Sequence, residues 1–192
     1  GVQSGIDSEL KTLGRKHTRQ DIINTFSLAR KFHFNNISLD IMLGLPDSNC
    51  ETLKESLQFA IDLSPEHISA YVLKIEENTS FYKNKNSLNL PDDDAQAEQY
   101  LFMCDFLQKN GYKHYEISNF CKTNMESRHN LKYWHCEEYL GIGPSAHSFL
   151  NGERFYYPKN LKEFINGTQP KSDGTGGTAE ENLMLALRLN DG

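Results

Sequence analysis

The chain has 192 residues, of which 38% are hydrophobic and 24% are charged, and its formal net charge is −6. This length and composition suit one globular domain, or a large part of an α/β barrel, with enough apolar residues to bury a core. The 20 basic residues are scattered among 26 acidic ones, so no basic stripe can hold a phosphate backbone and we expect no nucleic-acid partner.

Two further absences narrow the class of protein. No apolar stretch reaches the roughly eighteen residues of a membrane span, and the first residues carry no signal-peptide pattern. We therefore expect no transmembrane segment and a cytoplasmic location. The four cysteines lie far apart without a C-x-x-C pair, which indicates reduced thiols and no metal ligand set: Cys50, Cys104, Cys121 and Cys136.

The first part of the chain alternates between strand and helix patterns. Gly1–Ser4 resembles the end of a strand, and Thr18 with Asp21 forms a capping pattern before a helix over about 19–33. Residues 37–43 are a short apolar run closed by a turn sequence, which predicts a strand buried on both faces.

The alternation continues along the chain. Ser48 and Glu51 repeat the capping pattern before a second helix, and residues 67–73 predict another buried strand. Strands that alternate with helices over short connections predict parallel pairing with right-handed crossovers. A long helix begins at residues 92–94, and residues 112–120 are strand-like.

The last part of the chain has a weaker pattern. Residues 121–138 predict a polar loop with aromatic side chains, and residues 139–149 are extended and rich in glycine. Thr178 and Glu181 cap a final helix. The sequence thus predicts a barrel part with its extension over residues 1–171, a flexible linker over 172–177, and the start of a C-terminal helical domain over 178–192.

Polar residues at the carboxyl ends of parallel strands indicate a ligand site, because loops and helix N-termini converge at that edge. Gln3, Asp40 and the end of the strand at 69–74 belong to this edge. A carboxylate within an apolar strand is costly to bury without a partner. Asp40 therefore predicts either an internal ion pair, for which Arg15 is a candidate, or contact with a ligand amine or ribose hydroxyl.

A second candidate site lies in the segment Ser127–His135, where cationic, imidazole and aromatic groups occur within nine residues. Such a set suits a flat apolar ligand with acidic edges, because rings stack, an imidazole ligates iron and Arg or Lys pairs with carboxylates. The alternative is a structural loop in which Trp134 anchors the chain and His129 is only hydrogen-bonded. The glycines of 141–144 indicate a close backbone approach, and His147 reads as an interior histidine.

These segments together resemble a known family. The chain resembles the radical S-adenosylmethionine (SAM) proteins of the HemW and oxygen-independent coproporphyrinogen III oxidase type, in blocks that keep the family's order and spacing: residues 1–4, Arg15, 39–46, 67–71, 115–120, 129–134 and 139–144. The resemblance implies an α/β fold, a partial (β/α) TIM-like radical SAM barrel with mostly parallel strands and an added strand and helix extension.

The resemblance also implies cofactors and residues. The family binds SAM and a [4Fe-4S] cluster, and its HemW members bind heme. The positions that match SAM contacts are Gln3, Arg15, Asp40, Leu73 and Lys74, and those that match the heme-binding motif are His129, Asn130, Tyr133 and Trp134. Carried over in this way, the likeness favours ligand contact for Asp40 and heme contact for the 129–134 block.

The expected function is that of a heme chaperone that delivers heme to an acceptor protein. The alternatives are an oxygen-independent coproporphyrinogen III oxidase, which makes protoporphyrinogen IX by oxidative decarboxylation, and a barrel with an unrelated small-molecule reaction. The family's C-x-x-x-C-x-x-C cluster motif is not in this sequence. We therefore expect a truncated chain whose cluster cysteines lie upstream of Gly1, and which performs no radical chemistry alone.

Overall fold

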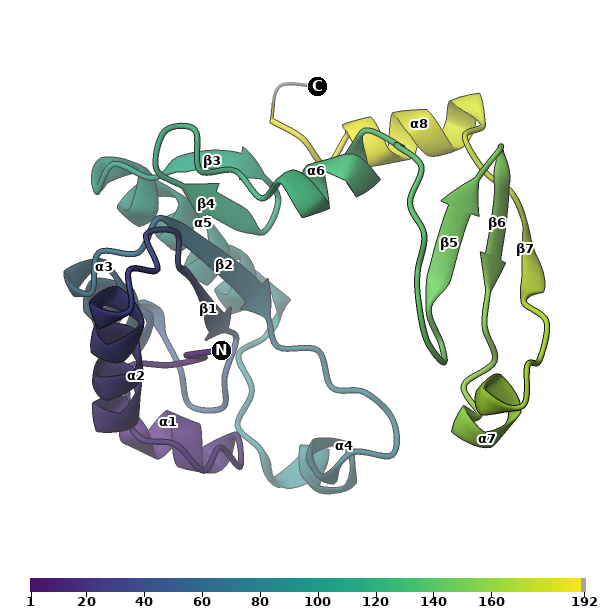
Figure 1. The fold of residues 1–192 in the computed structure, drawn as a ribbon. Coiled ribbons are helices and arrows are strands. Elements are labelled where there is room, and N and C mark those ends of the chain that lie inside the picture. The colour runs from purple at the N-terminus through teal and green to yellow at the C-terminus, as the bar shows by residue number, and fades with distance from the viewer. Residues whose placement is uncertain (191–192) are drawn as a thin grey trace. The chain divides into compact units, whose positions relative to one another are not determined.

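The computed structural model describes residues 1–190, and the chain divides into two compact units, one over residues 1–126 and one from residue 127 onward (Figure 1). Among the described residues, none of the helices combines the length and apolar character that crossing a bilayer requires.

The first unit is built on a four-stranded sheet with the order β1-β2-β4-β3. Strand β1 (Ser38–Leu43) pairs in parallel with β2 (His67–Val72), and helix α3 (Cys50–Asp62) connects them. Gln3 adds a further parallel bridge to Ile41. The predicted α/β fold with a parallel strand-helix-strand unit is confirmed here.

The third predicted strand, residues 112–120, is instead a hairpin. Strands β3 (Lys113–Glu116) and β4 (Asn119–Cys121) pair antiparallel, and β4 also runs antiparallel to β2. The prediction of one strand is wrong because the chain turns at Ile117, an apolar residue that gave no turn signal. A register shift between His114 and Glu116 marks a β-bulge.

Helix caps follow the sequence closely, with one correction. Helix α2 (Arg19–Lys31) begins with a capping box in which the Thr18 and Asp21 side chains each accept from the other's backbone, as predicted. Helix α3 is capped by Asn49 with Thr52, so the predicted pair of Ser48 and Glu51 is wrong by one position. The Ser48 hydroxyl instead donates to the Leu45 carbonyl at 2.7 Å and closes the turn after β1.

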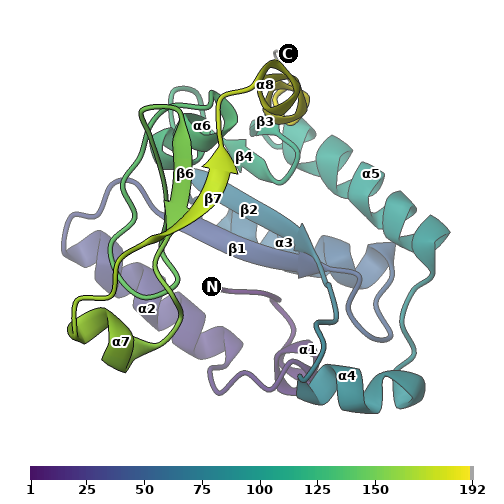
Figure 2. The ribbon, with the colours of Figure 1, turned by 90° about the vertical axis from the view of Figure 1, so that its right-hand side faces the viewer.

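Helices α2, α3 and α5 (Asp93–Lys109) lie along one face of this sheet (Figures 1 and 2), and their apolar stripes form the core with it. Strand β1 alternates, with Leu39, Ile41 and Leu43 buried and Asp40 and Met42 on the partly open face. The prediction that this strand is buried on both faces is therefore wrong. The shorter helical elements of the unit are α1 (Asp7–Thr12), α4 (Ser80–Asn84) and the 3-10 helix η1 (Lys85–Ser87).

The second unit contains an antiparallel sheet, β5-β6-β7, with helices at its ends. The strands are β5 (His147–Leu150), β6 (Glu153–Tyr156) and β7 (Lys171–Thr175). Helices α6 (Arg128–Trp134) and α8 (Ala179–Ala186) lie at one end of this sheet and α7 (Leu161–Ile165) at the other (Figures 1 and 2).

The structure departs from two predictions for this region and confirms a third. The expected loop at 121–138 contains helix α6, and most of the expected linker at 172–177 belongs to β7, which pairs with β6. Thr178 caps α8 as predicted, because its hydroxyl accepts from the Glu181 amide at 3.2 Å. The predicted C-terminal segment 178–192 ends with residues 191–192, which lie outside the described residues.

Candidate functional site

Gln3 and Asp40, two of the residues assigned to SAM by resemblance, are neighbours in the first unit. The Gln3 backbone amide donates to the Asp40 backbone carbonyl at 2.6 Å, and the Met42 backbone amide donates to the Gln3 backbone carbonyl at 2.8 Å. A Cβ atom at Gly1 would overlap the Gln3 side-chain amide and lie 2.8 Å from Oδ2 of Asp40. The two polar groups therefore lie side by side. Gln3 holds this place with a left-handed φ of 68°, an unusual conformation for a residue with a Cβ.

Asp40 does not form the ion pair with Arg15 that the sequence offered as one alternative. Its carboxylate is 42% exposed. Arg15 is exposed after α1, and its backbone amide donates to Leu10 at 2.9 Å. Because the carboxylate faces the open side of β1, it does not need a buried partner, and it stays available to a ligand.

His67 is a residue of this sheet face that the sequence reasoning left without a role. Its Nδ1 lies 2.8 Å from the Ser38 hydroxyl, and its Nε2 lies 2.8 Å from the Tyr115 hydroxyl. Burial lowers the pKa of His67, and the negative charge of Asp40 opposes that shift. Burial thus favours the neutral form of this imidazole, which lies between two hydroxyl groups.

Glu116 and Asn119 extend the same polar face. Glu116 is fully buried, and its carboxylate accepts from the Ser118 amide at 3.0 Å and from the Asn119 side-chain amide. Cross-strand pairing puts Asn119 opposite Ser69 and Ser69 opposite Asp40. Cross-strand partners share a sheet face, so this face carries a row of polar groups. Glu116 and Asn119 were missed from the sequence, although their alternation with apolar residues in strand-like segments is a signal that could have pointed to them.

Leu73 and Lys74, the other two residues assigned to SAM, follow β2 directly. The Leu73 amide donates to the Leu43 carbonyl at 2.8 Å, which continues the parallel pairing. Lys74 is exposed, and its ammonium lies 3.2 Å from Glu76. Both residues therefore sit at the carboxyl edge of the β1–β2 pair. An exposed ion pair of this kind contributes little to stability.

The four residues assigned to heme lie on or beside one short helix of the second unit. Ser127 caps the start of helix α6, where its hydroxyl accepts from the Asn130 backbone amide at 3.3 Å. One turn apart on this helix, Nε2 of His129 lies 3.0 Å from the Tyr133 hydroxyl, and the two rings meet edge to face. His129 is exposed. The alternative of a purely hydrogen-bonded histidine remains compatible with this contact.

A hollow of about 340 Å³ adjoins this helix within the second unit. Tyr133 and Trp134 form one side of it, and the others that border it are Cys136, Glu137, Tyr139, Arg154, Glu181 and Leu185. The Tyr133 and Tyr139 rings lie 4.6 Å apart, and the Arg188 guanidinium lies 4.2 Å from the Trp134 ring centroid. The hollow therefore has aromatic walls.

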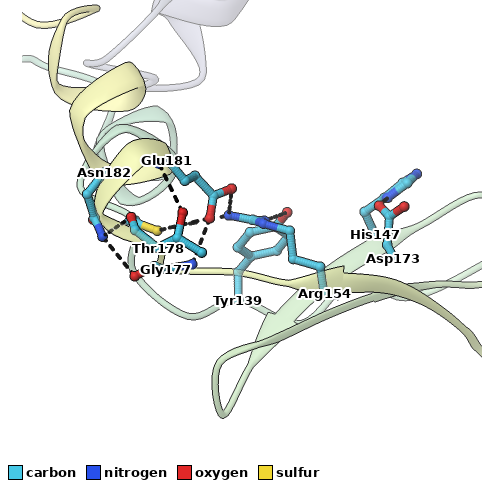
Figure 3. Close-up of polar contacts among 9 residues, drawn as sticks. Tyr139, His147, Arg154, Asp173, Gly177, Thr178, Glu181 and Asn182 are labelled. Atoms are coloured by element: carbon cyan, nitrogen blue, oxygen red, sulfur yellow. Dashed lines mark hydrogen bonds and ion pairs between the residues drawn. The ribbon is translucent and has the colours of Figure 1, made fainter.

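Arg154 and Glu181 are charged residues that border the hollow, and no sequence pattern predicted their pairing. Their closest atoms are 2.7 Å apart, and the Arg154 guanidinium also donates to the Tyr139 hydroxyl at 3.2 Å (Figure 3). Burial alone lowers the pKa of Arg154, but the hydrogen bond and charge of Glu181 outweigh it and raise that pKa. The guanidinium is thus a permanent cation.

His147 and the glycine-rich segment differ in how well they were predicted. His147 is exposed, stacks on Tyr156 and lies 3.2 Å from Asp173 (Figure 3), so the prediction of an interior histidine is wrong. A Cβ atom at Gly141 would overlap the His147 carbonyl, and the Gly141 amide donates to the Ser148 hydroxyl at 3.0 Å. The predicted close backbone approach at these glycines is confirmed.

The described residues contain no group of three or more His, Cys, Asp or Glu side chains that could hold a metal ion. All four cysteines are free thiols, and burial raises the pKa of three of them: Cys50, Cys104 and Cys121. A [4Fe-4S] cluster needs thiolates that converge. The residues of this chain therefore do not fit an iron-sulfur cluster.

Comparison with curated proteins gives relatives along the whole chain. It is 40% identical to the heme chaperone HemW of Bacillus subtilis and 38% identical to that of Lactococcus lactis, in each case over 100% of this chain and 53% of the relative. It is also 38% identical to a mitochondrial radical S-adenosyl methionine domain-containing protein 1 of Danio rerio, over 100% of this chain and 47% of the relative. No family model matches the chain.

Among solved structures, the chain is similar to coproporphyrinogen III oxidase (HemN) of Escherichia coli, a radical SAM enzyme. The TM-score is 0.77 over 97% of this chain and 47% of that chain, at 18% sequence identity. This likeness shows the fold alone. The chain spans about half the length of the curated relatives it matches. With identity along its full length and this fold, the chain is a HemW-like member of the radical SAM proteins.

Proposed function

We propose that the protein of which this chain forms part is a heme chaperone, and that heme binds the second unit at helix α6. The observation that carries the proposal is the exposed His129 on the same short helix as Tyr133 and Trp134, beside a hollow with aromatic walls. The curated relatives named heme chaperones support it. A heme-acceptor protein and a cytoplasmic location belong to the same proposal.

The chemistry of these residues suits heme as cargo. A neutral imidazole can ligate iron, and aromatic rings can cover the faces of a porphyrin. His129 would supply an imidazole nitrogen to the heme iron; because the Tyr133 hydroxyl lies 3.0 Å from Nε2, either Nδ1 would be the ligand or this contact would break when heme binds. Trp134 supplies apolar surface, and Asn130 holds the first turn of α6 through its amide. Because His129 is exposed, the cargo can be released to another protein.

The first unit supports a separate proposal, that the polar sheet face binds SAM. Asp40 has an open carboxylate for an amine or ribose hydroxyl, and the Gln3 amide beside it can donate or accept. Leu73 and Lys74 flank the same edge, and Arg15 joins the site only if its exposed side chain turns towards it. Bound SAM would supply the methionine and adenosine groups. The residues described in this chain do not themselves fit an iron-sulfur cluster.

Hemin titration tests the heme proposal. We expect the chain to shift the Soret band of hemin, and His129→Ala to weaken binding by about 10-fold or more, because an axial ligand is lost. His135→Ala is the matched control, since His135 is an exposed histidine that ends the same helix. The proposal fails if hemin gives no shift, or if the two variants behave alike.

The alternative of a coproporphyrinogen III oxidase has less support. The solved oxidase shares the fold at 18% identity, and a common fold does not fix a common reaction. An anaerobic assay of the full-length, reconstituted protein would decide the matter. Release of carbon dioxide from coproporphyrinogen III would favour the oxidase over the chaperone.

A further inference from the structure

The hollow of the second unit has a side that the heme-motif residues do not explain. Besides Tyr133 and Trp134, it is bordered by Arg154 from β6 and Glu181 from α8. A cation beside aromatic walls suits a flat ligand that carries an acidic group at its edge. Arg154 is therefore a candidate for a ligand contact as well as for a structural ion pair.

The surroundings of Arg154 fix the guanidinium in place. It lies 4.5 Å from the Phe149 ring centroid, donates to the Tyr139 hydroxyl at 3.2 Å, and pairs with Glu181 at 2.7 Å. The Arg154 and Glu181 side chains are each 21% exposed. Because these contacts already order the guanidinium, it loses little further conformational freedom when a ligand binds. Its planar fork also matches the geometry of a carboxylate.

Glu181 can give up Arg154 without being left as an uncompensated charge. Its second carboxylate oxygen accepts from the Gly177 amide at 2.7 Å (Figure 3). Glu181 also lies in the first turn of α8, where the helix dipole favours a negative charge. The carboxylate thus keeps two stabilising interactions if Arg154 turns to another acid. This makes the Arg154–Glu181 pair exchangeable.

We infer that Arg154 binds a carboxylate of the porphyrin cargo, and that this ligand carboxylate replaces Glu181 on the guanidinium when the cargo enters the hollow. The inference rests on the proposed heme-binding function and adds to it the contact for the acidic edge of the ring. No covalent step is involved, only the exchange of one carboxylate for another. Heme bears two propionates, and one of them is enough to make the contact with Arg154.

The test uses hemin and hemin dimethyl ester, in which both carboxylates are blocked, with the full chain in the same detergent buffer. Arg154→Gln should weaken hemin binding by about 10-fold and leave ester binding almost unchanged, because a charge-assisted bidentate pair is lost only for hemin. Glu181→Gln should tighten hemin binding several-fold, because the competing carboxylate is gone while an oxygen remains for the Gly177 amide. Lys159→Gln, which removes the same charge from an exposed site in this unit, should change neither.

The opposite signs of the two variants separate a ligand contact from a structural ion pair. If Glu181→Gln weakens hemin binding as much as Arg154→Gln does, the pair is structural and the inference is wrong. Equal losses for hemin and its ester also overturn it. Should Arg154→Gln fail to fold, Glu181→Gln and the hemin-to-ester ratio of the unaltered chain still decide. Hemin binding that depends on His129 but not on Arg154 removes this inference and leaves the proposed function intact.

Discussion

The two compact units are held together in different ways. The first has a continuous apolar core, in which Leu57, Ile68, Met103 and Phe120 are fully buried. In the second unit, Phe149 is the one large apolar side chain that is buried among the described residues. The helices of that unit instead expose large apolar groups, among them Leu183, Met184 and Leu187.

The two units therefore differ in the source of their stability and in how easily they can open to a ligand. Burial of apolar surface is the dominant favourable contribution to folding, and the first unit has most of it. The second unit depends more on strand pairing and on aromatic contacts. Regions with few buried contacts open at lower free energy. A site for cargo that must be taken up and released suits such a region.

The largest expected effect compares two leucines. Leu57→Ala in α3 should lower the free energy of unfolding by about 2–5 kcal/mol, because it leaves a cavity in a packed core. Leu187→Ala, at a side chain that is 74% exposed, should change it by less than about 0.5 kcal/mol. Urea denaturation followed by circular dichroism measures both. Similar losses for the two variants would contradict the contrast between the units.

A smaller effect is expected from the half-buried ion pair of each unit. In the first unit Arg30 donates to Glu66 at 2.8 Å, and Glu66 also accepts from the Ile37 amide at 3.0 Å. Glu66→Gln should cost about 1 kcal/mol of unfolding free energy, since the pair is partly screened by solvent. Glu181→Gln should leave global unfolding nearly unchanged and instead speed amide hydrogen exchange in α8. A slow, unaltered α8 in that variant would show that the second unit is as firmly held as the first.

The smallest expected effect is a pH dependence confined to the first unit. Burial puts the pKa of His67 below its value in the unfolded chain, about 6.5. Above that pH His67 is neutral in both the folded and the unfolded chain, and its contribution to the free energy of unfolding is fully present. Below it the unfolded chain takes up a proton that the folded state resists, so stability falls as the pH drops from 7 to 5.

His67→Gln should make the unfolding free energy less dependent on pH over that window. The unaltered chain, measured in the same buffers, is the reference for that slope. Thermal or urea unfolding at pH 7, 6 and 5 measures the slopes. An unchanged slope in the His67 variant would mean that its imidazole is protonated equally easily in both states.

Much of the first unit could be predicted because its signals are local. The Thr18–Asp21 capping box and the parallel pair of strands follow from side-chain types at short spacing. The hairpin of β3 and β4 could not, because Ile117 gives no turn signal and the bulge near Glu116 depends on pairing with another strand. Short helix α6 and strand β7 were missed because polar and glycine residues there carry no clear period.

The candidate sites follow the same division. The adjacency of Gln3 and Asp40 follows from the expectation that parallel strands end at one edge, and the structure brings the two together. Arg15 was expected with them, but a loop side chain is not fixed by any strand register. Arg154 lies on strand β6 and Glu181 on helix α8, far apart in the sequence. Sequence spacing does not predict a contact between such distant residues.

The single tryptophan of the chain is Trp134, which stacks under the Arg188 guanidinium and borders the hollow of the second unit. Its intrinsic fluorescence therefore monitors that unit alone, whereas tyrosine emission comes from both. An indole next to bound heme would be quenched by energy transfer, which gives an optical readout of loading without a label. A denaturation curve in which indole emission and far-ultraviolet dichroism diverge would show that the units melt in separate steps.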